Sequence, residues 1–310
     1  MNRADRVAVT SRSFSRNAIL RAELLGRYER VTFNDAGRQL HADELVEFLS
    51  GHEKAITALE KIDEYVLSRL PGLKIIGKYG VGIDMIDLDA MRRHGKCLGW
   101  TAGVNCRSVA ELTVSFAIAL LRGVMAANRE VLAGTWRQYI GGQLSGRVVG
   151  IIGCGYIGKD LVHLLKPFGC SILVNDIRHF GDFYAEHDIE AVALEALLAR
   201  ADVVTLHVPL DHSTRGMLTS ERLSLMKPTA ILINAARGGL VDEAALKAAL
   251  MGKRLAGAAF DVFAVEPPHD NELLALPNFL ATPHIGGSAE EAILAMGRAA
   301  IDGLDNNQIP

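Results

Sequence analysis

The sequence predicts an α/β protein with two doubly wound parallel-sheet domains and a cleft between them. Short β-branched runs alternate with segments of helical periodicity, which is typical of βαβ units. The strand runs are apolar almost continuously, as expected where helices cover both faces of a sheet. The chain has 310 residues, of which 49% are hydrophobic, so it can form more than one core.

The predicted strands fall into two groups. The first group, "RVAVTS", "KAITAL" and "LKIIGKYG", lies within residues 1–105. The second group opens at Arg147 with "RVVGIIGCG" and continues with "CSILVND", "DVVTLHVPL", "TAILINAARG", "LAGAAFDVF" and "NFLATPHIG". Each group is long enough for one sheet, so we expect one sheet on each side of the intervening segment.

That intervening segment predicts one long helix over about residues 109–128. Its stretch 112–121 is apolar nearly all round, which indicates a helix buried at the boundary between two domains. The sequence that follows, "GTWRQYIGGQLSG" over 134–146, contains the breakers of a loop or arm that leads into the second sheet.

Charge and cysteine content exclude several classes of function. The 33 basic and 36 acidic residues are well mixed, with a net charge of −3, so we expect no nucleic-acid partner. The N-terminus lacks the apolar run of a signal peptide, and the stretch 112–121 is too short to cross a bilayer, so we expect no membrane partner. Four cysteines without a C-x-x-C pair predict neither a metal site nor disulfides, and favour the cytoplasm.

A dinucleotide site is predicted where the second sheet begins. Gly153, Gly155 and Gly158 form G-x-G-x-x-G between an apolar strand and a helix, the pattern of a Rossmann-like fold. The three glycines permit a tight turn, the approach of a pyrophosphate and close helix–strand packing. The amides of Tyr156 and Ile157 open the helix, where unpaired N–H groups favour anions.

An acidic residue at the end of the next strand favours NAD over NADP. Asp176 lies 18 residues after Gly158, where a carboxylate binds a ribose 2′-hydroxyl and repels a 2′-phosphate. Arg178 is the one nearby feature that opposes this preference. The motif at "GKYGVG", residues 77–82, is not followed by a helix of the right pattern, so we interpret it as a loop at a strand end.

Three charged side chains follow later strands of the second group and predict acid–base chemistry. They are Arg237, Glu266 and His284. Ligands bind beyond the carboxyl ends of strands in open α/β sheets, so we expect the three to meet there. A histidine can move the hydroxyl proton of a 2-hydroxy acid, a carboxylate can orient the imidazole, and an arginine can hold the substrate carboxylate.

Four segments in order resemble signatures of the D-isomer-specific 2-hydroxyacid dehydrogenase family, most closely its phosphoglycerate dehydrogenase-like branch. They are "GIIGCGYIG", "LINAARGGLVDEAAL", "AAFDVFAVEPP" and "TPHIGGSA". The resemblance implies a flavodoxin-like substrate-binding domain, residues 1–105 plus 288–310, and an NAD-binding Rossmann domain, residues 106–287. It also implies Arg237 as the substrate-binding arginine, Glu266 as the partner of the histidine and His284 as the acid–base.

The resemblance extends to further positions around the cofactor and the substrate. The implied cofactor-binding residues are Gly153, Gly155, Tyr156, Ile157, Gly158, Asp176, His207, Val208, Pro209, Thr214, Ala235, Ala236, Asp261 and Gly286. The implied substrate-binding residues are those of the loop Lys78, Tyr79, Gly80, Val81 and Gly82. We expect Pro283 and the glycines 286–287 to shape a tight turn that aims His284 at the site.

The match is weaker where phosphoglycerate dehydrogenases bind the substrate phosphate. Thr57 takes the place of their arginine, while Lys78 and Arg12 could supply a cation instead. The chain ends at Pro310, so we expect no regulatory amino-acid-binding domain. In the family the long helix and the arm after it build a dimer, and the "GTWRQ" arm around Trp136 therefore implies a homodimer.

Three interpretations of the function stay open at this point. The first is an NAD-dependent oxidoreductase that interconverts a D-2-hydroxy acid and its 2-keto acid, with 3-phosphoglycerate as one candidate. The second is an NAD(H)-sensing binding protein similar to corepressors of the same fold. The third is a formate or phosphite dehydrogenase, in which Lys78 and Arg237 would hold the anion.

Overall fold

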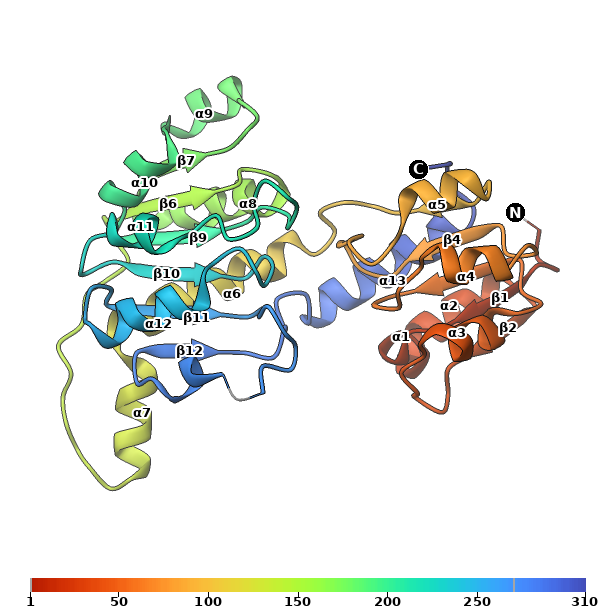
Figure 1. Cartoon of the computed structure of the whole chain (residues 1–310), viewed down its shortest axis with the longest axis horizontal. Coiled ribbons are helices and arrows are strands. Elements are labelled where there is room, and N and C mark those ends of the chain that lie inside the picture. The colour runs from red at the N-terminus through yellow and green to blue at the C-terminus, as the bar shows by residue number, and fades with distance from the viewer. Residues whose placement is uncertain (1, 270) are drawn as a thin grey trace. The chain divides into compact units, whose positions relative to one another are not determined.

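The computed structural model describes residues 2–269 and 271–310, and the chain divides into two compact units. Unit 1 comprises residues 1–105 and 287–310, and unit 2 comprises residues 106–286. Each unit contains one parallel sheet covered by helices on both faces (Figure 1). Two parallel-sheet α/β units confirm the predicted fold class. The division lies one residue before the predicted one, at Gly287.

Unit 1 is built on a five-stranded parallel sheet of order β2-β1-β3-β4-β5. The strands are β1 (Arg6–Val9), β2 (Arg30–Phe33), β3 (Lys54–Thr57), β4 (Ile75–Lys78) and β5 (Cys97–Gly99). The helices are α1 (Arg12–Arg16), α2 (Ala18–Arg27), α3 (Ala42–Leu49), α4 (Glu64–Arg69), α5 (Leu88–Arg93) and α13 (Glu290–Gly303).

The last helix completes the core of unit 1. α13 lies against β4 and β5, and in Figure 1 it is the blue helix beside the orange sheet. The contact is close because β4 offers a glycine: a Cβ on Gly77 would lie 2.4 Å from the carbonyl oxygen of Ala300. Two apolar clusters fill the two faces of the sheet, one with α3, α4 and α5 and one with α1, α2 and α13.

Unit 2 is built on a seven-stranded parallel sheet of order β12-β11-β10-β9-β6-β7-β8. The strands are β6 (Val148–Ile152), β7 (Ser171–Asn175), β8 (Ile189–Ala191), β9 (Val203–Leu206), β10 (Ile231–Asn234), β11 (Gly257–Phe260) and β12 (Phe279–Ala281). Chain order reverses between β6 and β9, and ligands of such sheets bind beyond the carboxyl ends of strands at this point.

Helices cover both faces of this second sheet. The α-helices are α6 (Cys106–Arg122), α7 (Val124–Leu132), α8 (Tyr156–Leu165), α9 (Gly181–His187), α10 (Leu194–Arg200), α11 (Ser220–Ser224) and α12 (Glu243–Met251). The 3₁₀ turns are η1 (Lys166–Phe168) and η2 (Glu272–Ala275). One apolar cluster includes residues of α10, α11 and α12, and the other includes residues of α6, α8 and α9.

The prediction of one continuous helix over 109–128 is wrong. The helix begins at Cys106 and breaks at Gly123, whose φ of +60° ends α6 and starts α7 at an angle of 65°. α6 also buries only one face rather than its whole circumference. Residues 134–146 form neither helix nor strand, as predicted. In the described part of the chain, no single helix is long and apolar enough to cross a membrane.

Candidate active site

The ends of three neighbouring strands bring the predicted chemistry to one edge of the unit 2 sheet. Asn234 ends β10 and is in register with Phe260, which ends β11. Phe260 is in turn in register with Ala281, which ends β12. The segments that carry the three predicted catalytic residues therefore all start at the same edge.

His284 and Glu266 form a hydrogen-bonded pair at this edge. The imidazole Nδ1 of His284 lies 2.8 Å from Oε2 of Glu266. The second carboxylate oxygen, Oε1, accepts the backbone N–H of Phe263 at 3.0 Å, which holds the carboxylate in place. A carboxylate accepts the proton of Nδ1, so the ring nitrogen Nε2 is the one left for chemistry. The side chains are 49% and 38% exposed.

A buried carboxylate shapes the turn that presents the imidazole. Asp261, at the end of β11, accepts the hydroxyl of Thr282 at 2.6 Å and the N–H of Ile285 at 2.7 Å through Oδ1. Its Oδ2 accepts the N–H of Gly286 at 2.7 Å, and its backbone carbonyl accepts the N–H of His284 at 2.9 Å. Four bonds from one residue therefore fix the whole turn.

The turn differs from the predicted one because the left-handed backbone conformation falls on His284 and not on a glycine. His284 itself has a φ of +55°, whereas neither Gly286 nor Gly287 is in the left-handed region. A positive φ costs a residue with a side chain about 1 kcal/mol or more, and the bonds to Asp261 offset that cost. At Gly286 the feature is close packing instead, because a Cβ there would lie 3.0 Å from Oδ2 of Asp261.

Arg237 lies on a loop that touches the loop of the carboxylate. Asn234 closes the turn, since its side chain donates to the carbonyl of Arg237 at 2.9 Å and accepts the N–H of Ala236 at 3.2 Å. A Cβ on Gly238 would lie 1.8 Å from the carbonyl oxygen of Phe263, so the backbones after β10 and β11 are in direct contact. Ala235 and Ala236 are buried at this strand end.

The glycine turn after β6 leaves an open approach to the backbone. Gly153 has a φ of +96°, and a Cβ there would lie 2.6 Å from the carbonyl oxygen of His207. A Cβ on Gly158 would lie 2.3 Å from the carbonyl oxygen of Gly153, so the start of α8 packs directly on the turn. At Gly155, by contrast, no atom lies within 4 Å of the Cβ position.

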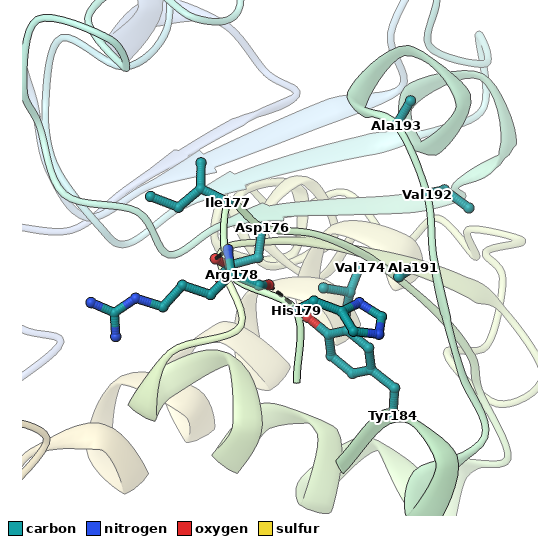
Figure 2. A pocket seen from close by; sticks show the side chains of 9 residues that line it. All are labelled: Val174, Asp176, Ile177, Arg178, His179, Tyr184, Ala191, Val192 and Ala193. Atoms are coloured by element: carbon teal, nitrogen blue, oxygen red, sulfur yellow. Dashed lines mark hydrogen bonds between the residues drawn. The ribbon is translucent and has the colours of Figure 1, made fainter. Parts of the chain in front are cut away.

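The carboxylate of Asp176 is tied to the glycine turn and lines a pocket of about 250 Å³. Oδ2 accepts the N–H of Cys154 at 2.6 Å, and Oδ1 accepts the N–H of Arg178 at 2.7 Å. Tyr184 of α9 and residues 191–193 also line this pocket, and Figure 2 shows their side chains with that of Asp176. Burial raises the pKa of Cys154 to about 11, so this thiol stays protonated and is no nucleophile.

The segment after β9 forms a wall beside the glycine turn. Burial lowers the pKa of His207 to about 3, so its imidazole is neutral at working pH, with Nε2 3.0 Å from the hydroxyl of Thr205. The hydroxyl of Thr214 donates to the carbonyl of Pro209 at 2.7 Å and closes the loop. Val208 and Pro209 lie in the chain between His207 and Thr214.

The loop 78–82 after β4 in unit 1 presents backbone amides. Lys78 is buried, and its Nζ donates to the carbonyls of Ala58 and Tyr79. The N–H groups of Gly80, Val81 and Gly82 have no acceptor within the described part of unit 1. Successive backbone amides that point to one side of a turn form an anion-binding concavity, which makes this loop a candidate site for a substrate carboxylate.

Thr57 ends β3 and is in register with Lys78. It is the residue that the sequence analysis places where phosphoglycerate dehydrogenases have an arginine. Its hydroxyl is buried and has no hydrogen-bond partner among the described residues. Arg12 lies in the first turn of α1 and is exposed. The end of β3 therefore presents a neutral hydroxyl rather than a cation.

Comparison with known proteins decides the family. Residues 114–286 match the family model described as "D-isomer specific 2-hydroxyacid dehydrogenase, NAD binding domain". The chain belongs to this dehydrogenase family. It is 38% identical over 241 residues to a D-3-phosphoglycerate dehydrogenase of Bacillus subtilis, covering 77% of this chain and 46% of that protein. It is 39% identical over 236 residues to an (S)-sulfolactate dehydrogenase of Chromohalobacter salexigens, covering 75% and 76%.

Solved structures of the same family superpose on nearly the whole chain. The crystal structure described as a D-isomer specific 2-hydroxyacid dehydrogenase from Polaromonas matches with a TM-score of 0.89 at 29% identity, covering 97% of this chain and 96% of that one. The chain spans about half the length of several curated relatives that it matches.

NAD is the cofactor of this family's domain, and the residues present fit it. The open position at Gly155 leaves room for a pyrophosphate against the backbone, and the first amides of α8 have no acceptor among the described residues. The carboxylate of Asp176 stands at the end of β7, where a ribose hydroxyl is bound in such dehydrogenases.

Two structural residues of this dehydrogenase site were missed by the sequence reasoning. Asn234 closes the arginine turn, and its signal was available: it is a buried amide at the end of an otherwise apolar strand. Glu243 of α12 accepts the N–H of Ala264 at 3.0 Å and supports the loop of Glu266. No sequence pattern marks Glu243, because an acidic residue in the first turn of a helix is common.

Proposed function

We propose that the chain is an NAD-dependent dehydrogenase that interconverts a D-2-hydroxy acid and its 2-keto acid. The single observation that carries the proposal is the pair of His284 and Glu266, with Nδ1 and Oε2 2.8 Å apart, at the strand ends beside the arginine loop. The three side chains supply a proton acceptor, its orienting carboxylate and a cation for a substrate carboxylate.

The proton step follows from the geometry of the pair. In the direction of oxidation, neutral Nε2 of His284 takes the proton of the substrate hydroxyl as C2–O becomes a carbonyl. Glu266 keeps the other proton on Nδ1 and stabilises the imidazolium that forms. NAD held at the glycine turn would supply the acceptor for the hydride that leaves C2. In reduction, the imidazolium returns the proton to the oxygen.

We propose that two groups bind the substrate carboxylate. The guanidinium of Arg237 forms charge-assisted hydrogen bonds, which are stronger than neutral ones. The loop from Lys78 to Gly82 contributes through the amides of Gly80, Val81 and Gly82, with Lys78 and Tyr79 supporting the loop from within unit 1.

The cofactor-binding residues are proposed from their places around the glycine turn. Gly153, Gly155 and Gly158, with the amides of Tyr156 and Ile157, bind the pyrophosphate, and Asp176 binds the adenosine ribose. The residues proposed for the remaining contacts are His207, Val208, Pro209, Thr214, Ala235, Ala236, Asp261 and Gly286.

A substrate screen tests the proposal. The protein is incubated with NAD and glycerate, lactate, 3-phosphoglycerate, sulfolactate, formate or phosphite, and NADH formation is followed at 340 nm, then repeated with NADP. We expect turnover with at least one 2-hydroxy acid and a preference for NAD. Turnover with formate or phosphite alone, or NADH binding without any turnover, would contradict the proposed reaction.

We also propose that the protein is a homodimer formed through α7 and the arm over 134–146. α7 buries none of its residues in the described structure, and it exposes large apolar side chains that a second copy could cover. These exposed side chains, together with those of the arm, are Val124, Met125, Val131, Leu132, Trp136, Tyr139 and Ile140. Light scattering should show twice the chain mass of 33.5 kDa, and a monomer would contradict the proposal.

We propose a cytoplasmic location for the enzyme. The four cysteines are all free thiols, which suits a reducing compartment. Fractionation of the source cells, with activity recovered in the cytosol, would support this, and recovery outside the cell would contradict it.

A further inference from the structure

We propose that Trp100 is a positioning residue for the substrate carboxylate: its indole N–H fixes the direction in which the N–H of Gly82 points. The inference rests on the proposed function and identifies a side chain outside the sites described above. Trp100 directly follows β5, and its Nε1 donates to the carbonyl oxygen of Val81 at 2.9 Å.

The peptide unit between Val81 and Gly82 is planar, and this planarity links the direction of its carbonyl to that of its N–H. The carbonyl of Val81 and the N–H of Gly82 belong to one planar trans peptide and point in opposite directions. Because the carbonyl of Val81 points at the indole of Trp100, the N–H of Gly82 must point away from it. The indole therefore sets the orientation of a donor that has no acceptor in the described part of unit 1.

The other end of the loop is held in the same manner. Nζ of Lys78 lies 3.4 Å from the carbonyl oxygen of Tyr79, whose peptide unit carries the N–H of Gly80. Gly80 has a φ of +124°, which a residue with a side chain rarely adopts. Two side chains thus hold two carbonyls of the loop, and each of these bonds fixes the direction of the N–H in the same peptide unit.

Backbone packing fixes the position of the indole. A Cβ on Gly99 would lie 2.0 Å from the carbonyl oxygen of Gly303, so the end of β5 is pressed against the end of α13. Trp100 directly follows Gly99 in the chain, and 40% of its surface is exposed. The bond from Nε1 is the contact that ties this partly exposed ring to the loop, so we expect its loss to free the carbonyl of Val81.

The test uses the only other tryptophan as its control. Trp100→Phe keeps an aromatic ring and removes the N–H donor, while Trp136→Phe makes the same change on the arm. For W100F we expect KM for the 2-keto acid to rise five- to tenfold, because one hydrogen bond is lost. We expect kcat and the Kd of NADH to stay within twofold of wild type. W136F should match wild type in all three, because phenylalanine keeps an apolar aromatic side chain on the proposed dimer surface.

Two measurements do not depend on turnover. Calorimetry should show the Kd of oxamate, an unreactive 2-keto acid analogue, raised by the same factor in W100F in the presence of NADH. Hydrogen exchange of the peptide that spans residues 79–83 should be faster in W100F than in W136F.

The outcomes separate the two proposals. A KM and an oxamate Kd within twofold of wild type in W100F would overturn the role of Trp100, as would oxamate failing to bind the wild-type protein. Wild-type protein without turnover, but with weaker oxamate binding in W100F, would support Trp100 and overturn the proposed reaction.

Discussion

Replacing Glu266 by Gln isolates the orienting role of the carboxylate. Its two oxygens accept two N–H groups, from Phe263 at 3.0 Å and from Nδ1 of His284 at 2.8 Å. Glutamine has one acceptor oxygen and one NH₂ group. If its oxygen keeps the bond to Phe263, the NH₂ faces Nδ1, which must then be unprotonated, and Nε2 of the neutral ring carries the hydrogen. That tautomer cannot accept a proton from the substrate.

The alternative orientation of the amide has a cost that can be estimated. With the oxygen turned to His284, the NH₂ and the N–H of Phe263 meet as two donors, and the unsatisfied pair costs about 1–3 kcal/mol. This reduces the productive fraction about 5- to 150-fold. The loss of the negative charge beside the imidazolium lowers kcat further, because the imidazolium is then less stabilised. We therefore expect kcat for oxidation to fall about 100- to 1000-fold, within the range of general acid–base catalysis.

The assay compares E266Q with E243Q in steady-state oxidation and reduction, with the Kd of NADH measured by fluorescence. Glu243 supports the same loop through the N–H of Ala264 at 3.0 Å, but it is not the residue that contacts the imidazole. E243Q should retain kcat within about threefold. Two results would refute the reasoning. If E266Q kept kcat within threefold, the carboxylate would not be needed to orient the imidazole. If E243Q lost as much as E266Q, the carboxylate would act only by shaping the loop.

Three further predictions concern the cofactor and stability. Gly158→Ala places a Cβ 2.3 Å from the carbonyl oxygen of Gly153, so the Kd of NADH should rise at least about tenfold by titration; an unchanged Kd would contradict the packing argument. Asp176→Asn removes the charge that repels a 2′-phosphate, so the ratio of kcat/KM for NAD over NADP should fall about tenfold or more; an unchanged ratio would contradict it. Hydrogen bonds from Arg6 lower the pKa of Glu53 from 4.5 to about 2, so their contribution is full above the unfolded pKa and is lost as pH falls toward 2. Urea unfolding should show Glu53→Gln less stable by about 1 kcal/mol at pH 7 and equal to wild type near pH 2, and a constant difference would contradict the linkage.

Local patterns predicted the buried strands and the glycine turn, because each depends on residues close together in the chain. The strands that were missed, β2, β5 and β8, all lie at sheet edges, where a strand is short and needs no continuous apolar run. The break at Gly123 was hidden because the apolar pattern continues on both sides of it.

The residues of the site were easier to predict than the bonds that orient them. His284, Glu266 and Arg237 could be selected because charged side chains at strand ends are conspicuous in an apolar sequence. The left-handed backbone of His284 depends on Asp261, which is 23 residues earlier in the chain, and only the pairing of β11 with β12 brings them together. The bond from Trp100 to Val81 likewise depends on tertiary structure.

The most direct test of the account is the kinetics of His284→Gln. In the proposed mechanism Nε2 of this imidazole moves the hydroxyl proton, while the glycine turn and Asp176 hold the cofactor by its pyrophosphate and ribose. We predict that kcat falls at least about 100-fold in both directions, with the Kd of NADH within twofold of wild type. A variant that retains kcat within threefold would contradict the central role of the imidazole.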